Sequence, residues 1–291
     1  MMDEFYEGVI QTNDTYSRFY HYVSLTQNIE KRLDSFNNYR SYHYKDLFYI
    51  KKNLQGTSVI DILDVGCCGT PYPKLFDLSV VNYHGVDISE HSLERMNQFY
   101  NDPRIKWVLD DILDLNTFPD QSLDLILATQ VFEHLVDPER ALFSCLSKLR
   151  KGGKIMIGTE AALFLQNGEQ YGFFTKILLG LSQYLGSLFS IYGLEPQYYP
   201  HYEIHEFKDG DVTRKIRIPH GHFHPLYFSH IINIRNWPAK ITFRRITGGT
   251  VFDALALALG EKVYYFWQEI KARIPLLREL GNQIFVVVEK K

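Results

Sequence analysis

The sequence predicts an α/β fold built on a doubly wound parallel sheet, and three features predict it. Short apolar runs alternate with helical stretches between residues 58 and 160, as in successive strand–helix–strand units. Two of these runs carry an acid near their carboxyl end, Asp64 and Asp87. The first run is followed by a turn containing Gly66 and Gly69, as expected where a buried parallel strand ends beside a bound nucleotide.

The glycine turn lies in the segment 62–72, which reads ILDVGCCGTPY. Gly66 and Gly69 allow the backbone to approach a ligand closely, and Asp64 could accept hydrogen bonds from a ligand's amine or from loop N–H groups. This segment resembles the first motif of the class I S-adenosylmethionine-dependent methyltransferases. The Pro71-Tyr72 variant resembles members associated with glycan and cell-surface biosynthesis. Cys68 stands where a central glycine is usual in that family, and we expect it to line the cofactor site.

The second acid, Asp87, follows Asp64 by about one strand–helix–strand unit. A carboxylate here can accept both ribose hydroxyls of a nucleoside, and Ile88 is predicted to line the same cofactor site. Ser89 is a good N-cap for a helix over roughly 90–100. The alternative is that Asp87 only caps that helix.

A third strand is expected at 105–108, followed by two acids. The resemblance implies that Asp111 takes the exocyclic amine of the adenine and that Ile112 packs on the ring, with Asp110 as the second choice. Both acids could equally be solvated loop residues. A fourth buried strand closes with Thr129 and Gln130, which are also predicted to bind the cofactor.

Asp137 and Pro138 open a helix that is expected to run to about residue 150. Gly152 and Gly153 are expected to end it and turn into a fifth strand at 155–159. The resemblance therefore covers 58–160 and implies a Rossmann-like seven-stranded sheet whose last strand is antiparallel. Segments 240–246 and 284–289 are predicted to be its last two strands, with two helical stretches of unassigned role over 254–280.

Composition excludes several classes of function. A formal net charge of −3 and a pI near 6.4 argue against nucleic acid as the main partner. Three cysteines do not make a disulfide framework, and the acidic start lacks a secretory pattern. We therefore expect a cytoplasmic protein.

The flanks are predicted to select the substrate. Residues 1–57 form an aromatic-rich N-terminal helical cap on a methyltransferase domain over 58–291, and aromatic rings with polar tips suit sugars. Residues 160–226 form a helical insertion or lid after the fifth strand. Within it, 173–194 is interrupted too often to span a bilayer and is interpreted as an amphipathic helix. That helix could form a lid, pack a homodimer or rest on a membrane surface.

Three histidines, His220, His222 and His224, alternate along an extended segment and should share one side of it. A metal site is one interpretation, although the geometry is poor and no carboxylate follows at a familiar spacing. The resemblance implies substrate-site histidines instead. We take His222 as the general base, with His220 and His134 as further candidates; His134 could only orient its loop.

The leading hypothesis is methyl transfer from S-adenosylmethionine to a hydroxyl or amine of a small-molecule, sugar-like or glycan acceptor, without a metal. Three alternatives stay open. A nicotinamide-dependent oxidoreductase needs a third glycine where Pro71 and Pro73 stand. A catalytically silent binding module would explain Cys68, although it has no need for three acids at strand ends. A metal-dependent enzyme would use the three histidines.

Overall fold

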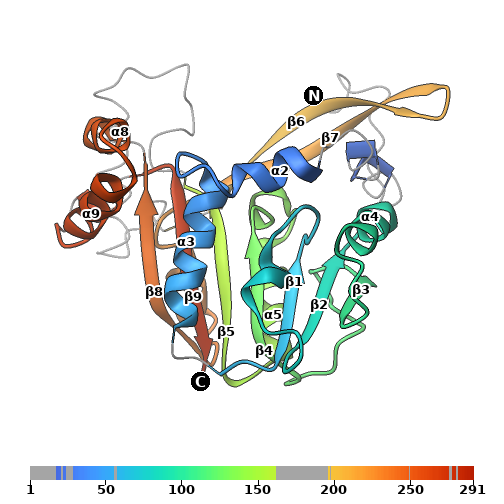
Figure 1. Cartoon of the computed structure of the whole chain (residues 1–291). Helices are drawn as coiled ribbons and strands as arrows, with labels where there is room; N and C mark the ends of the chain where they lie inside the picture. Colours follow the sequence, from blue (N-terminus) through green and yellow to red (C-terminus); the bar gives the residue numbers. More distant parts are fainter. Residues whose placement is uncertain are drawn as a thin grey trace.

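The computed structural model describes residues 18–20, 22–23, 29–55, 58–161, 196, 198–248, 250–274, 277–279 and 281–291. These residues fold around a seven-stranded sheet of order β3-β2-β1-β4-β5-β9-β8, from which a two-stranded sheet, β6-β7, extends (Figure 1). The strands of the large sheet are β1 (Asp61–Val65), β2 (Asn82–Asp87), β3 (Ile105–Leu109), β4 (Leu123–Thr129), β5 (Leu149–Glu160), β8 (Ala239–Thr247) and β9 (Gln283–Lys290).

The central strands are apolar because both of their faces are covered. Every residue of β4 except Asp124 is buried, as is typical of a parallel sheet between two helical layers. β1 pairs in parallel with β2 and β4, and the parallel pairing continues to β3 and β5. Only β9 is reversed, because it runs antiparallel to both β5 and β8. The predicted Rossmann-like doubly wound sheet of seven strands with one antiparallel strand is confirmed.

The described helices begin where local capping groups allow it. Ser89 accepts a hydrogen bond from the Ser92 N–H, and Asp137 accepts one from the Arg140 N–H, so both predicted helix starts are confirmed. The α-helices are α2 (Ile29–Ser35), α3 (Tyr42–Leu54), α4 (Glu90–Tyr100), α5 (Pro138–Lys148), α7 (Tyr227–Ile234), α8 (Val251–Ala258) and α9 (Glu261–Lys271). Short 3-10 helices are η1 (Tyr72–Leu75), η2 (Phe132–His134) and η3 (Leu277–Glu279).

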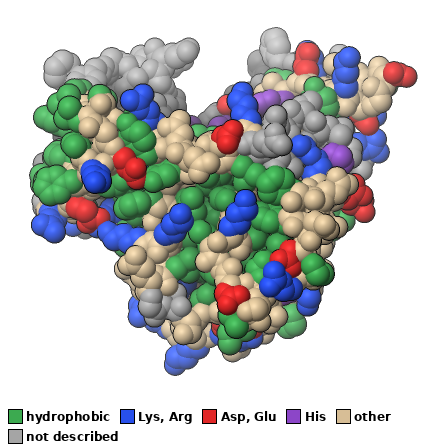
Figure 2. All heavy atoms as spheres, in the orientation of Figure 1, with side chains coloured by type: hydrophobic (Ala, Val, Ile, Leu, Met, Phe, Trp, Pro, Cys, Tyr) green, Lys and Arg blue, Asp and Glu red, His purple; other side chains and the backbone are tan. Residues whose placement is uncertain are grey.

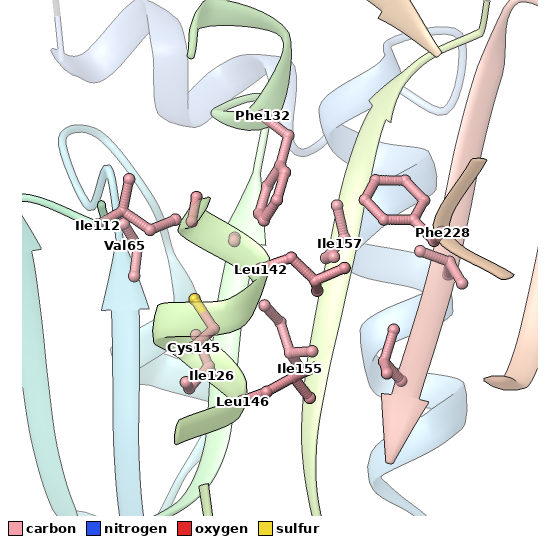
Figure 3. Close-up of a cluster of buried hydrophobic side chains, with 14 of the residues drawn as sticks. Val65, Ile112, Ile126, Phe132, Leu142, Cys145, Leu146, Ile155, Ile157 and Phe228 are labelled. Carbon is pink, nitrogen blue, oxygen red and sulfur yellow. The ribbon is translucent and has the colours of Figure 1, made fainter. Parts of the chain in front are cut away.

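One face of the sheet packs against α5 and α7. Figure 3 shows this core, in which Leu142 and Cys145 of α5 meet Ile126 and Ile155 of the sheet. Phe228 of α7 lies in the same cluster, with its ring 5.7 Å from that of Phe132. The helix that begins near residue 227 is therefore a core helix on the face of the sheet.

The opposite face packs against α3 and α9. The Tyr49 ring of α3 lies 5.5 Å from the Phe285 ring of β9, and the Tyr265 ring of α9 stacks on Phe48 at 3.8 Å. α3 therefore shares the core of the sheet, although it lies in the predicted N-terminal cap. The domain boundary at residue 57 stays a prediction.

The described part of the insertion after β5 is a β-hairpin, so the prediction of a helical insertion is wrong for these residues. β6 (Tyr198–Asp209) pairs antiparallel with β7 (Val212–Phe223) along its whole length. Cross-strand pairing makes these two strands regular, and Gly210 supplies the positive φ of 64° that a tight turn needs. The predicted amphipathic helix at 173–194 lies outside the described residues.

The predicted start of the fifth strand is corrected, and the two helical stretches before the last strand are confirmed. β5 begins at Leu149, directly after α5, so Gly152 and Gly153 lie inside the strand at a register shift against β4 rather than in a turn before it. The two helical stretches between the last strands are confirmed as α8 and α9. In the described ranges, none of the helices has the length and apolar character needed to cross a bilayer.

Candidate active site

The glycine turn after β1 requires both of its glycines. Gly66 and Gly69 have φ values of 65° and 73°, which L side chains rarely adopt. A Cβ on Gly66 would lie 2.6 Å from Cγ2 of Val131, and one on Gly69 would lie 2.6 Å from Cδ of Arg32. Cys68, next to Gly69, is buried, and burial raises the pKa of its thiol. The turn is thus a close-packed backbone cradle at the carboxyl end of β1.

Asp64 is the buried acid beneath this turn. Its Oδ2 accepts hydrogen bonds from the Thr70 hydroxyl (2.6 Å) and the Tyr83 hydroxyl (2.8 Å). Its Oδ1 has no hydrogen-bond partner in the part of the chain that the structure describes. Burial raises the pKa of Asp64 to about 7, against the lowering effect of both hydroxyls and of the Arg32 charge. Asp64 therefore holds the loop with one oxygen and leaves the other able to accept a donor from a ligand.

Asp87 closes β2 at the same edge of the sheet. Its Oδ1 accepts the Ser89 N–H at 2.9 Å, while Ser89 itself caps α4. Burial raises the pKa of Asp87 to about 6, although the Ser89 N–H and the Arg32 charge lower it. Ile88, which follows, is half-buried. Asp87 thus stabilises the entry to α4, and its prediction as a ribose ligand is untested.

Arg32 of α2 is a site residue that the sequence did not indicate. Its side chain lies against Gly69, and its positive charge lowers the pKa of both Asp64 and Asp87. It also lowers the pKa of His43, which burial brings to about 3. Because the whole of α3 lies between α2 and β1 in the sequence, no local pattern linked Arg32 to the glycine turn.

The two candidate adenine ligands, Asp110 and Asp111, lie in the loop after β3 and make different hydrogen bonds. Asp110 holds this loop, because its Oδ2 accepts both the N–H and the hydroxyl of Thr117. Asp111 is half-buried and accepts the Leu113 N–H, so it is the better placed of the two acids. Ile112 is only 3% exposed and lies in the core beside Val65 (Figure 3), so its side chain offers little surface to a ring.

Thr129 ends β4 and Gln130 follows it, next to the glycine turn. The Thr129 hydroxyl lies 2.8 Å from the Tyr72 hydroxyl, and Gln130 takes a left-handed φ of 57°. The Gln130 amide donates to Oδ2 of Asp46 at 2.9 Å. Asp46, on α3, is fully buried, and burial raises its pKa well above the usual value. Its carboxyl packs against Gly158, where a Cβ would lie 2.5 Å away.

A carboxylate and two histidines meet at the end of β5. His222 Nε2 lies 2.9 Å from Oε2 of Glu160, and His220 Nε2 lies 3.5 Å from the same oxygen. The cause is a parallel bridge between Ala161 and Phe223, which sets the neighbouring residues Glu160 and His222 side by side. The histidines hold the pKa of Glu160 well below its usual range, and Glu160 raises the pKa of His220.

Glu160 is the second site residue that sequence reasoning missed. Its signal was present, because it is a charged residue that closes an apolar strand at the carboxyl edge. Its partners lie in a hairpin more than fifty positions later, so the pairing depends on the tertiary fold. Figure 2 shows histidine side chains gathered along this upper edge of the molecule.

η2 brings a third histidine to the cluster. The His134 ring lies 5.0 Å from the His220 ring, and burial lowers the pKa of His134 to about 4. Glu133 is buried and accepts the Thr159 hydroxyl at 2.7 Å, and burial raises its pKa to about 7. Burial raises the pKa of Tyr42, at the start of α3, and the charges of Glu133 and Glu160 add to this rise.

His224 does not join the other two hairpin histidines, so the prediction that all three share one side is wrong for it. It lies beyond the end of β7, is 1% exposed, and accepts the Leu226 N–H at Nδ1. Its role is to hold the start of α7. Among the described residues, no group of three or more histidine, cysteine or acidic side chains has the arrangement of a metal site.

Comparisons with known proteins agree with this geometry. A family profile described as a methyltransferase domain matches residues 63–157, about a third of the chain. The ubiquinone biosynthesis O-methyltransferase of Idiomarina loihiensis is 28% identical over 118 residues, which are 39% of this chain and 47% of that protein. The chain thus spans about half the length of that relative. The enzyme of the same name from Coxiella burnetii is 25% identical over 172 residues, 57% of this chain and 68% of that protein.

Two solved structures are also similar to most of this chain. An S-adenosylmethionine-dependent methyltransferase from Mesorhizobium loti has a TM-score of 0.49 and 15% identity, over 84% of this chain and 98% of that one. The N-methyltransferase NodS from Bradyrhizobium japonicum, in complex with S-adenosyl-L-homocysteine, has a TM-score of 0.45 and 13% identity, over 86% and 87%.

Residues 63–157 are therefore similar to a methyltransferase domain, and one of the compared structures contains S-adenosyl-L-homocysteine. The matched span begins in β1 and ends in β5, so it contains the glycine turn, Asp87, Asp111 and Gln130. Glu160, the hairpin histidines and Arg32 lie outside it.

Proposed function

We propose that this chain transfers the methyl group of S-adenosylmethionine to a hydroxyl or amine of a small or sugar-like acceptor, with His222 as the general base. The observation that carries the proposal is the 2.9 Å contact between His222 Nε2 and Glu160 Oε2 at the carboxyl edge of the sheet. Glu160 closes β5, which lies two strands from the glycine turn after β1. At the usual strand spacing the two features are about 10 Å apart.

The residues around the glycine turn fit the cofactor. Asp64 offers the unpartnered, buried Oδ1 to an amine, and the Arg32 guanidinium lies beside it, suited to a carboxylate. Asp87 suits the ribose hydroxyls, and Asp111 suits the adenine amine. Gly66 and Gly69 leave room for the chain of the ligand, which a Cβ on either residue would restrict.

When bound beside these residues, S-adenosylmethionine would supply an electrophilic methyl carbon, with sulfur as the leaving group that keeps the electron pair. The acceptor atom must lose a proton, and the contact with Glu160 supports His222 as the group that takes it. Glu160 fixes the orientation of the His222 ring and stabilises the imidazolium that forms.

The other two candidate bases fit this role less well. Burial lowers the pKa of His134 to about 4, so its imidazole is a weak base near neutral pH. Both ring nitrogens of His220 face carboxylates, Nε2 at 3.5 Å from Glu160 and Nδ1 at 3.4 Å from Glu203, so neither is directed at an acceptor. The rings of His134 and His220 are therefore better suited to line the acceptor site and to donate hydrogen bonds than to act as bases.

Two measurements test the proposal. Calorimetric titration should show binding of S-adenosylmethionine and S-adenosyl-L-homocysteine, and this binding should fall in Asp87→Asn. Production of S-adenosyl-L-homocysteine should then be followed with a panel of phenols, amines, nucleotide sugars and glycans. His222→Ala should lower turnover by about 10²- to 10⁴-fold without changing cofactor affinity.

His205→Ala is a matched control, because His205 lies on the same hairpin and pairs with Glu203 rather than with Glu160. Equal loss of turnover in both variants would contradict a specific role for His222. Loss of cofactor binding in His222→Ala would assign it a structural role. A cytoplasmic location and a homodimer stay predictions.

A further inference from the structure

α8 and α9 present a large apolar surface to solvent. Six large apolar side chains on this pair of helices are between 41% and 81% exposed: Val251, Phe252, Leu255, Leu259, Val263 and Phe266. We call these six residues the α8–α9 patch. On α8 they recur at helical spacing, so they share one face. A contiguous apolar face of this kind marks an interaction surface.

The solvent face of α8 carries no charge. Its one acid, Asp253, is turned inward and is 3% exposed. Asp253 accepts hydrogen bonds from the Trp267 indole and the Gln268 amide and forms an ion pair with Lys271 at 2.8 Å. Buried Asp253 thus joins α8 to α9, and the apolar residues of α8 face solvent.

Basic residues accompany the patch along α9. Lys262 is exposed one helical turn before Phe266, and Arg273 is exposed just after the helix ends. Of the two acids of α9, Glu269 pairs with Lys52 and Arg245, whereas Glu261 is exposed and accepts the Tyr44 hydroxyl, so it offsets one of the two cations. An uncharged apolar face with cationic neighbours complements an anionic lipid surface, in which apolar groups enter the interface and cations meet the headgroups.

The patch lies at the catalytic end of the molecule. Figure 1 shows α8 beyond the same end of the sheet as α2 and the β6–β7 hairpin, and Figure 2 shows the apolar surface at its upper left. α8 follows β8 directly, and β8 runs in the same direction as β5, which ends at Glu160.

We propose that the α8–α9 patch docks this protein on the surface of an anionic phospholipid bilayer. The inference does not depend on the proposed methyl transfer, since it rests on exposure and charge alone. Its consequence is that the carboxyl edge of the sheet is held near the headgroups.

The test is flotation of the full chain with phosphatidylcholine vesicles, with and without phosphatidylglycerol. We expect binding to the anionic vesicles that the triple variant Val251→Gln/Leu255→Gln/Phe266→Gln weakens about a hundredfold, from the apolar burial that three such side chains lose. Lys262→Glu should weaken it at least about fivefold, the contribution of one basic residue near an anionic leaflet.

The matched control is Val80→Gln/Val136→Gln/Ile234→Gln, which changes three similarly exposed residues outside α8 and α9. It should bind vesicles like the unchanged protein, and thermal melting should show that both triple variants are folded. Absence of vesicle binding by the unchanged protein, or equal binding by the α8–α9 variant, would overturn the proposal. So would light scattering that shows a dimer converted to a monomer by the α8–α9 variant, because a second copy would then cover the patch.

Discussion

Replacing Asp64 by Asn should change the stability of the fold and the affinity for the cofactor in opposite directions. Asp64 is 1% exposed and lies under the glycine turn, where burial raises the pKa of its carboxyl from 3.8 to about 7. An asparagine keeps an oxygen that can accept the Thr70 and Tyr83 hydroxyls, but it carries no charge to desolvate. We therefore expect Asp64→Asn to stabilise the fold while it weakens binding of the cofactor's ammonium group.

The magnitude follows from the pKa of the folded state. A carboxyl whose pKa is raised on folding contributes stability that is present below its unfolded pKa and lost as pH rises through the folded value. A rise from 3.8 to about 7 corresponds to about 4 kcal/mol at 1.36 kcal/mol per unit. Asp64→Asn should thus raise the free energy of unfolding by up to about 4 kcal/mol at pH 8 and by less than about 2 kcal/mol at pH 5.

The assay is urea denaturation at pH 5 and pH 8, together with calorimetric titration of S-adenosylmethionine. Asp110→Asn is the opposite control. Although burial raises the pKa of Asp110, hydrogen bonds from Thr117 and the Asp111 N–H lower it overall, so this variant should lose stability at pH 8. An Asp64→Asn protein that gains no more stability at pH 8 than at pH 5 would refute the reasoning, because Asp64 would then ionise at no cost in the fold.

Three other substitutions have clear expected outcomes. Glu160→Gln should reduce turnover about 10²-fold, because the imidazolium of His222 loses its counter-charge; unchanged kinetics would contradict this. Arg32→Met should weaken cofactor binding at least about tenfold in calorimetric titration, as expected for a lost charge-assisted hydrogen bond, with turnover at saturation less affected. Gly85→Ala should lower the free energy of unfolding by about 1–3 kcal/mol in urea, because its Cβ would overlap the Trp107 ring, and a neutral result would show that the ring can move.

The strands of the large sheet could be predicted because each is a short apolar run buried on both faces. β4 illustrates this, since burial of nearly all its residues leaves one continuous pattern in the sequence. The hairpin could not be predicted in the same way. Its strands contain histidines, tyrosines and charges on partly exposed faces, and only the cross-strand pairing and the turn at Gly210 make them regular.

The position of the proposed cofactor residues at one edge of the sheet could be predicted for a related reason. Asp64, Asp87 and Asp111 each follow or close a strand, so their shared edge follows from the parallel topology. Arg32 and Asp46 come from helices that precede the sheet, and only packing brings them to it. Local patterns carry no information on such contacts.

The carboxyl edge is divided between two chemical tasks. The residues proposed to bind the cofactor belong to β1 to β4 and the loops after them, within the span that matches the methyltransferase profile. The residues proposed to bind the acceptor, Glu160, His220 and His222, come together where Ala161 pairs with Phe223, which joins the end of β5 to the end of the hairpin. Since the hairpin contributes His220 and His222 but no strand to the large sheet, its sequence can change without altering the strands that carry the cofactor site. Acceptor specificity in this chain is therefore expected to follow the hairpin, and substitutions there should affect the KM for the acceptor while cofactor affinity stays constant.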